Sequence, residues 1–233
     1  MKIIILLLSL FITRISLGQK HSISVNYLPS ITTLGKQNQS FDHYYFNSRN
    51  GVTTLNTAAS LHYNLQACST IGFGLGLEFS SQGQDIKFMT NSNIPENNYQ
   101  TFSTQLNYFR IPLTVNYAVV NHKKNIVRIY SGLNLGFAIE RNDNYNDIIQ
   151  ESILLPPANK RYKDKDWAIP IGVNLQHTLC NNIFASIGFE QMFGLTNSFS
   201  DFGLSRFGVL SEFKNSKQNR TSFNIGIGIN LTK

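Results

Sequence analysis

The sequence predicts an all-β protein: an eight-stranded antiparallel up-and-down β-barrel that spans a membrane. Three observations predict it. Apolar residues alternate with polar or small ones over long segments such as 71–79, which gives each strand one apolar and one polar face. Eight such segments follow one another along the chain. The connections between them alternate long and short, a pattern typical of outer-membrane barrels with long external loops and short periplasmic turns.

The first residues are predicted to be a cleaved leader. Lys2 supplies a positive charge, residues 3–12 are largely apolar, and Ser16-Leu17-Gly18 offers the small residues that a signal peptidase reads. An apolar run of about ten residues is too short for a transmembrane helix, which needs about 20. We therefore expect a signal peptide over residues 1–18 and one barrel domain over residues 19–233.

The first three strands are expected at 21–28, 52–66 and 70–80. A long polar loop, 29–51, separates the first two, whereas only a turn at 67–69 separates the second from the third. The third strand has the most regular alternation: five apolar residues face one way, and small residues, including the glycines at 72, 74 and 76, face the other. We expect the Gly-X-Gly pairs Gly72/Gly74 and Gly226/Gly228 to leave room for bulky neighbours inside the barrel.

The fourth and fifth strands are expected at 101–119 and 126–140, joined by a short basic turn. Long polar loops at 81–99 and 141–165 flank this pair. Pro112 lies inside the fourth strand, and Pro170 lies inside the sixth. Proline cannot donate to a strand ladder, so a bulge or a lost hydrogen bond is expected at each.

A hairpin over 167–197, with its turn at 179–182, supplies the sixth and seventh strands. After a fourth long loop, 198–218, the eighth strand runs from 221 to 231. In it Ile225, Ile227 and Ile229 alternate with glycine and asparagine. This strand completes the even number that a closed up-and-down barrel of this type has.

Periodicity alone does not say which face of the barrel points inward. A soluble carrier of the lipocalin type, with its apolar residues inside, is therefore the alternative. Aromatic residues at strand ends favour the membrane, because aromatic girdles mark both interfaces of a membrane barrel. These residues are Trp167, Phe109, Tyr117, Phe193 and Phe223.

The formal charge is +7, and it falls to +5 once Lys2 and Arg14 leave with the leader. The basic residues are not gathered into one aromatic-lined stripe, which argues against a nucleic-acid partner. A modest positive charge instead suits membrane lipid and the phosphates of lipopolysaccharide.

Two cysteines, Cys68 and Cys180, fall in the second and sixth connections. In an eight-stranded barrel these turns lie on opposite sides of a ring roughly 15 Å across. A disulfide needs Cα atoms within about 7 Å of each other. We therefore expect two free thiols.

Charged residues on the polar faces are the candidates for a site, because the polar faces of a membrane barrel point into its lumen. Buried charges must pair, so a structural ion-pair network is expected, with a small pore or ion path as the alternative. No Ser/His/acid set, HExxH motif or P-loop occurs, so no enzyme activity, cofactor or metal is expected. The predicted lumen charges are Glu78, Arg110, Arg128, Glu190 and Arg220, with His62 beside them.

The long loops are expected to carry contacts with a partner. Aromatic and basic residues in the first and third of them are the predicted exposed contacts: Tyr44, Tyr45, Phe46, Lys160, Arg161 and Tyr162. We expect a monomer with a structural, surface-contact or secretion- or assembly-accessory role. A protein partner would bind at the extracellular loops or at the periplasmic turns.

Phe109-Arg110-Ile111-Pro112-Leu113, Gly194-Leu195-Thr196-Asn197 and the Gly-X-Gly pattern of the third and eighth strands resemble known barrels. The resemblance is to the PorT-like and OmpX-like outer-membrane barrels of Bacteroidetes-type bacteria. It implies the outer membrane as location and says little about activity. Arg110 stands where PorT-like barrels often have an acidic residue.

Overall fold

The structure, a computed structural model, describes residues 20–34, 51–52, 54–89, 99–143, 162–198 and 217–231. These residues form β-strands, and among them no helix is long and apolar enough to cross a membrane. The predicted signal peptide, 1–18, lies outside the described residues and stays a prediction. The strands are β1 (Lys20–Leu34), β2 (Gly51–Val52), β3 (Thr54–Gln66), β4 (Ile71–Met89), β5 (Tyr99–His122), β6 (Asn125–Asp143), β7 (Lys165–Cys180), β8 (Ile183–Asn197) and β9 (Lys217–Asn230).

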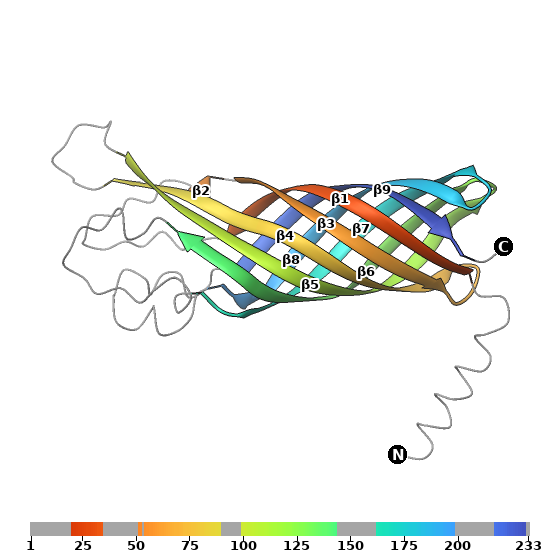
Figure 1. Cartoon of the computed structure of the whole chain (residues 1–233), viewed down its shortest axis with the longest axis horizontal. Coiled ribbons are helices and arrows are strands. Elements are labelled where there is room, and N and C mark those ends of the chain that lie inside the picture. Colours follow the sequence, from red (N-terminus) through yellow and green to blue (C-terminus); the bar gives the residue numbers. More distant parts are fainter. Residues whose placement is uncertain are drawn as a thin grey trace, which may run out of the picture.

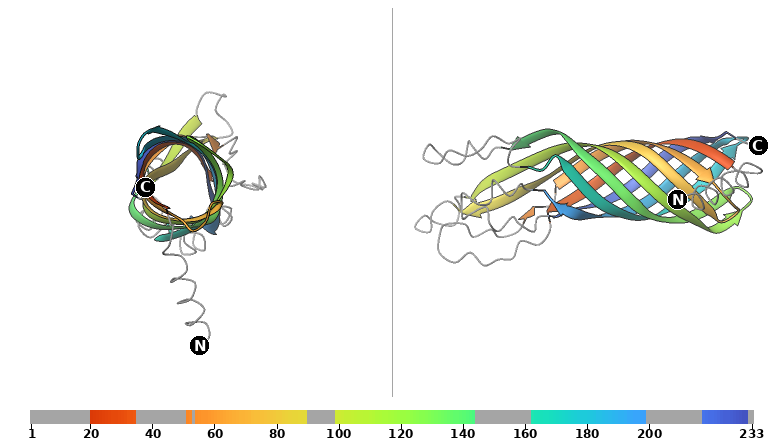
Figure 2. Two further views of the ribbon diagram at one scale, coloured as in Figure 1. Left: turned by 90° about the vertical axis from the view of Figure 1, so that its right-hand side faces the viewer. Right: turned by 90° about the horizontal axis from the view of Figure 1, so that it is seen from below.

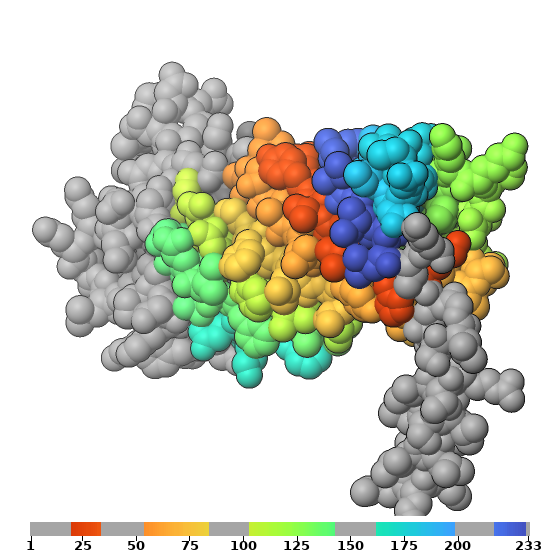
Figure 3. Space-filling view, turned by 45° about the vertical axis from the view of Figure 1, so that its right-hand side comes forward, coloured from red at the N-terminus to blue at the C-terminus, as the bar shows by residue number. Residues whose placement is uncertain are grey.

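The strands close into a ring, which confirms the predicted barrel (Figures 1 and 2). Each long strand pairs antiparallel with its neighbours in sequence, and β1 pairs with β9 to complete the circle. On the surface, β1 lies between β3 and β9 (Figure 3). The two-residue β2 pairs with β4 beyond the end of β3, so the barrel wall itself has eight strands. Closure leaves no unpaired strand edge within the wall, as a structure in lipid requires.

Several strands run farther than the sequence predicted. β1 continues to Leu34 instead of ending at Leu28, and β4 continues to Met89 instead of Ser80. β4 and β5 contain 19 and 24 residues, whereas a strand that spans a membrane needs about 9–11 residues. They extend beyond the other strands at the end opposite the three short turns (Figure 1). The extensions carry few apolar residues, so the sequence predicted loops there, although β4 and β5 remain paired by backbone hydrogen bonds.

The apolar faces of the strands point outward and the polar faces point inward. Leu75, Phe79 and Ile227 are 50%, 58% and 57% exposed, whereas Glu78 and Arg110 are 2% and 0% exposed. This arrangement is the reverse of a lipocalin, which buries its apolar face. The soluble-carrier alternative is therefore wrong, and the outward face provides the apolar band of a membrane barrel.

Each internal proline interrupts one of its two ladders and leaves the register intact. Pro112 pairs with Asn134 of β6, but the β4–β5 ladder skips from Leu75–Leu113 to Glu78–Arg110. Pro170 likewise pairs with Met192 of β8 and lies in a gap of the β6–β7 ladder. Pro29, which the sequence placed in a loop, does the same between β1 and β9. Of the two outcomes expected at Pro112 and Pro170, the structure shows lost pairing and no bulge.

Both cysteines are free and exposed, as predicted. Cys68 lies in the turn between β3 and β4, where its Sγ accepts a hydrogen bond from the backbone N–H of Ile71 at 3.3 Å and lies 3.6 Å from Thr70 Oγ1. Hydrogen bonds from the backbone and side chain of Thr70, and then from the backbone of Ile71, lower the pKa of the Cys68 thiol.

The lowered pKa predicts that Cys68 reacts with alkylating reagents at a lower pH than an ordinary cysteine does. The thiolate is the reactive form, so the rate of Cys68 alkylation should rise at the pH where the thiol ionises. This pH should be lower in Cys180→Ser than in Cys180→Ser/Thr70→Ala, because the second variant loses the side-chain hydrogen bond of Thr70. Mass spectrometry of iodoacetamide labelling across pH measures the inflection of the rate in each variant. Coincident inflections would contradict the assigned role of Thr70.

Candidate functional site

The described part of the lumen contains three arginines and three carboxylates. Arg110, Arg128 and Arg220 provide the positive charges, and Glu78, Glu190 and Asp166 the negative ones. Five of these six are predicted lumen charges; Asp166 is the one the sequence prediction missed. The six groups form two ion-paired clusters and one separate arginine.

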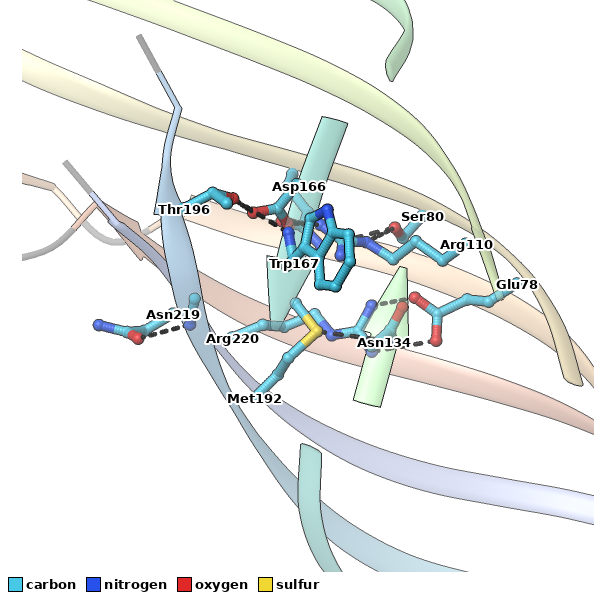
Figure 4. Close-up of polar contacts among 12 residues, drawn as sticks. Glu78, Ser80, Arg110, Asn134, Asp166, Trp167, Met192, Thr196, Asn219 and Arg220 are labelled. Atoms are coloured by element: carbon cyan, nitrogen blue, oxygen red, sulfur yellow. Dashed lines mark hydrogen bonds and ion pairs between the residues drawn. The ribbon is translucent and has the colours of Figure 1, made fainter. Parts of the chain in front are cut away.

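The first cluster joins β9, β4 and β8 across the lumen. Arg220 donates from Nη1 and Nη2 to the two carboxylate oxygens of Glu78, and Nη2 also lies 2.8 Å from Glu190 Oε1. Figure 4 shows the Arg220 side chain reaching from its strand toward Glu78. Tyr130 of β6 donates its hydroxyl to Glu190 Oε2 at 3.1 Å. Four strands are thereby tied together at one level of the barrel.

The second cluster joins β5 to β7 and is nearer the end of the barrel that lies opposite the turns. Arg110 Nη2 lies 2.5 Å from Asp166 Oδ2 and 3.1 Å from Gln82 Oε1, and its Nε donates to Ser80 Oγ. Thr196 donates to the other Asp166 oxygen at 2.8 Å (Figure 4). The Arg110 guanidinium also stacks 4.5 Å from the ring centroid of Tyr108. Arg110, predicted to join a network with the other lumen charges, has its ion pair with a residue outside the predicted set.

Glycines on the intervening strands leave the space through which these long side chains cross. A Cβ atom on Gly136 of β6 would lie 2.9 Å from Arg110 Nη1, because the arginine crosses β6 to reach β7. A Cβ on Gly172 would lie 2.3 Å from the Tyr130 ring, which crosses β7 to reach Glu190 on β8. The Gly-X-Gly pairs of β4 and β9 make space in the same way. The Asn116 side chain occupies the space beside Gly72, and the Phe184 ring occupies the space beside Gly228.

Gly136→Val should therefore displace Arg110 from Asp166. Overpacking of this kind costs about 1–3 kcal/mol, and here the displaced group is an ion-paired guanidinium. The unboiled protein on a gel should lose its fast-running band at a lower temperature than the wild type. Ser131→Val, at an exposed position on the same strand, is the matched control and should leave the transition unchanged. Equal transitions for the two variants would show that Gly136 does not hold open this path.

Arg128 is the third lumen arginine and has a different set of partners. It donates from Nη1 to Gln176 Oε1 of β7, and from Nη2 to Gln66 Oε1 of β3 at 3.1 Å. Among the described residues, no carboxylate lies within ion-pair distance of it. It lies close to the turns, only three residues after β6 begins. Arg128 thus crosses the lumen between two neutral amides.

A polar cavity of about 80 Å³ occupies the turn-side half of the lumen. Such a volume accommodates several water molecules. His62, one of the predicted lumen residues, lines this cavity. Its wall is mostly amide, hydroxyl and charged side chains from seven strands, and includes Asn26, Asn64, Asn116, Asn174, Asn224, Ser24, Ser186, Thr114, Gln176, Arg128, Tyr130 and Glu190.

The predicted contact residue Tyr162 is not at the surface. It is 2% exposed, and its hydroxyl lies 3.3 Å from Thr104 Oγ1 of β5. Residues 163 and 164, which follow it, are hydrogen-bonded to the barrel, the N–H of Lys163 donating to the carbonyl of Ser198 and that of Ala138 donating to the carbonyl of Asp164. The prediction that Tyr162 is an exposed contact is wrong. Tyr44, Tyr45, Phe46, Lys160 and Arg161 lie outside the described residues.

Ion pairs connect the strands across the described part of the lumen. No group of three or more His, Cys, Asp or Glu side chains suited to a metal ion occurs among the residues that the structure describes. The buried carboxylates Glu78, Glu190 and Asp166 all accept charge-assisted hydrogen bonds from arginine. This arrangement fixes strands relative to one another.

The comparisons with known proteins agree with this architecture. Residues 16–200 match the family model described as outer membrane protein beta-barrel domain. No curated protein is significantly similar to the chain. The outer membrane protein OprG from Pseudomonas aeruginosa superposes with a TM-score of 0.51 at 8% identity, covering 92% of this chain and 97% of that chain. Neisserial surface protein A gives a TM-score of 0.50 at 7% identity, covering 91% of this chain and 98% of that chain.

Proposed function

Because the chain belongs to the outer membrane protein beta-barrel domain family, we propose that it is a non-enzymatic surface-contact protein of the outer membrane. Its location in the outer membrane follows from the family and from the fold that it shares with OprG. The contact surface is the end of the barrel opposite the short turns, which faces the outside of the cell in barrels of this type.

One observation carries the proposal: ion pairs block the lumen. Arg220 and Arg110 are both 0% exposed, and each reaches across the barrel to a carboxylate on another strand. A blocked lumen leaves the outer end of the barrel as the surface on which such a protein acts.

The extended strands support the same role. β4 and β5 are too long for the membrane alone and continue outward as a paired ribbon. The resemblance to PorT-like barrels brings a secretion- or assembly-accessory role within the same proposal, since such a role also depends on contact with another protein.

A small pore is the less supported alternative. It requires a continuous path along the lumen, and the two ion-paired arginines interrupt that path. The turn-side cavity lies on one side of this barrier and does not by itself form a path through it.

Two measurements test the proposal together. Purified barrel in planar lipid bilayers should show no steady conductance. Cells that carry the chain should aggregate, or attach to protein- or glycan-coated surfaces, more than cells without it. Replacing residues 35–50 and 144–161 by short Gly-Ser links should abolish this gain, as should the combined Tyr44→Ala, Tyr45→Ala, Phe46→Ala, Lys160→Ala and Arg161→Ala change.

Lys123→Ala/Lys124→Ala is the matched control, because it removes two exposed charges at the turn end of the barrel. It should leave attachment unchanged. Each variant must keep its fast-running unboiled band, which shows that the barrel is intact. Attachment that survives the loop replacements, or steady conductance by the wild type, would overturn the proposal.

A further inference from the structure

Two charged side chains, Glu190 and Arg128, line the turn-side cavity. Amide and hydroxyl side chains such as that of Asn174 make up most of the remaining wall, and Leu28 and Phe184 are its apolar members. The ligand preference of the cavity therefore depends on which of the two charged groups is available.

Glu190 is already engaged. Its Oε1 accepts from Arg220 at 2.8 Å, and its Oε2 accepts from the Tyr130 hydroxyl at 3.1 Å. Arg220 in turn shares its single positive charge between Glu190 and Glu78, so this cluster carries a net charge of −1. It has no positive charge to offer a further anion, and its repulsion of an anion grows with that anion's charge.

Arg128 is available. A guanidinium has five N–H donors, and the two glutamine contacts involve only its two terminal nitrogens. Both partners are neutral, and no carboxylate of the described residues pairs with it. A half-buried guanidinium without a counter-charge favours an anion beside it, since charge-assisted hydrogen bonds are roughly twice as strong as neutral ones.

The position of Arg128 suits entry from one end. It lies three residues after the start of β6, near the turns, and is held by neutral amides, which are weaker partners than carboxylates. The ion pairs of Arg220 are buried. The turn end, from which we expect a solute to enter, faces the periplasm in this family.

We propose that the cavity is a binding site for a small monovalent anion of chloride size, held by Arg128 and filled from the periplasmic side. The volume of about 80 Å³ holds such an ion together with water molecules. A single charge is favoured because the Glu190 carboxylate lines the same cavity and repels a multivalent anion more strongly. The amide N–H groups of the lining asparagines supply the remaining donors.

The test uses the full barrel in lipid nanodiscs with 15N-labelled arginine. Chloride replaces gluconate at constant ionic strength, gluconate being too large for the cavity. The Arg128 side-chain NMR signal should shift and saturate with chloride, whereas that of Arg141, paired with Asp164 outside the cavity, should not shift. Sulfate at the same ionic strength should give no saturable shift.

Two variants test the site. Asn174→Leu removes a lining amide, and should weaken chloride binding about tenfold while the Arg128 signal remains observable. In the wild type, chloride should change the temperature at which the unboiled gel band disappears. Arg128→Gln should remove this change, whereas Arg128→Lys should retain part of it. A non-saturating shift shared by Arg141, a saturable shift with sulfate, or an unchanged chloride effect in Arg128→Gln would each overturn the proposal.

Discussion

Arg220→Met should destabilise the barrel by about 3–5 kcal/mol, the usual result of removing one partner from a buried ion pair. The change leaves Glu78 and Glu190 in the lumen with their shared counter-charge gone; the two side chains are 3% and 11% exposed. The cost arises mainly from the uncompensated carboxylates, because replacing a whole buried pair by apolar residues is often neutral. Equilibrium unfolding in denaturant, in phospholipid vesicles, measures the loss, with Trp167, the single tryptophan, as the fluorescent probe.

Two controls separate this effect from the loss of a long side chain. Adding Glu78→Gln and Glu190→Gln to Arg220→Met removes the unpaired charges and should recover much of the lost stability. Arg141→Met breaks a pair whose partner, Asp164, is 79% exposed, so it should cost no more than about 1 kcal/mol. If Arg220→Met costs as little as Arg141→Met, the cross-lumen cluster does not hold the strands together.

The second large effect is expected on the outer face. Leu113 of β5 is 42% exposed and lies between two outward aromatic positions of the same strand, Phe109 and Tyr117. If these aromatics mark the two membrane interfaces, Leu113 lies near the bilayer midplane. Leu113→Arg should then cost about 2–4 kcal/mol in vesicle-based unfolding, the range for arginine on the lipid face at this depth.

Leu55→Arg is the matched control for depth. Leu55 is 86% exposed at the start of β3, at the end of the barrel opposite the turns. Arginine near an interface costs only about 0–1 kcal/mol. Equal costs at Leu55 and Leu113 would contradict the assignment of the aromatic residues to the interfaces.

The alternation of side chains was sufficient to predict which residues face the lumen. Glu78 and Arg220 share parity with inward glycines and serines of their strands, Arg110 shares parity with Thr114 and Asn116, and this parity is a local property. The same rule identifies Asp166, two positions before the inward Ala168, but the sequence interpretation started the strand one residue later, at Trp167.

The choice of partners was not predictable, because parity does not give depth or position around the ring. Arg110 faces the lumen as predicted, yet it pairs with Asp166 two strands away. Which carboxylate an arginine reaches depends on the stagger of all the strands, a property of the closed barrel. The extent of β4 and Tyr162's burial were missed for a related reason. Backbone pairing and packing against the barrel determine both, and neither leaves an apolar repeat in the sequence.

The pairing of β1 with β9 has a consequence for the order in which the molecule folds. The ring closes between the first and last strands of the described chain, so closure joins the contacts that are most distant in sequence. The Arg220–Glu78 ion pair spans 142 residues and likewise needs β9 in place. Contacts of such long range are slow to form, because loop closure must precede them. Until then two strand edges stay open, and the bilayer does not tolerate open edges. Insertion and closure should therefore be a single late, cooperative step. The hairpins should form first, and the ion pairs across the lumen last.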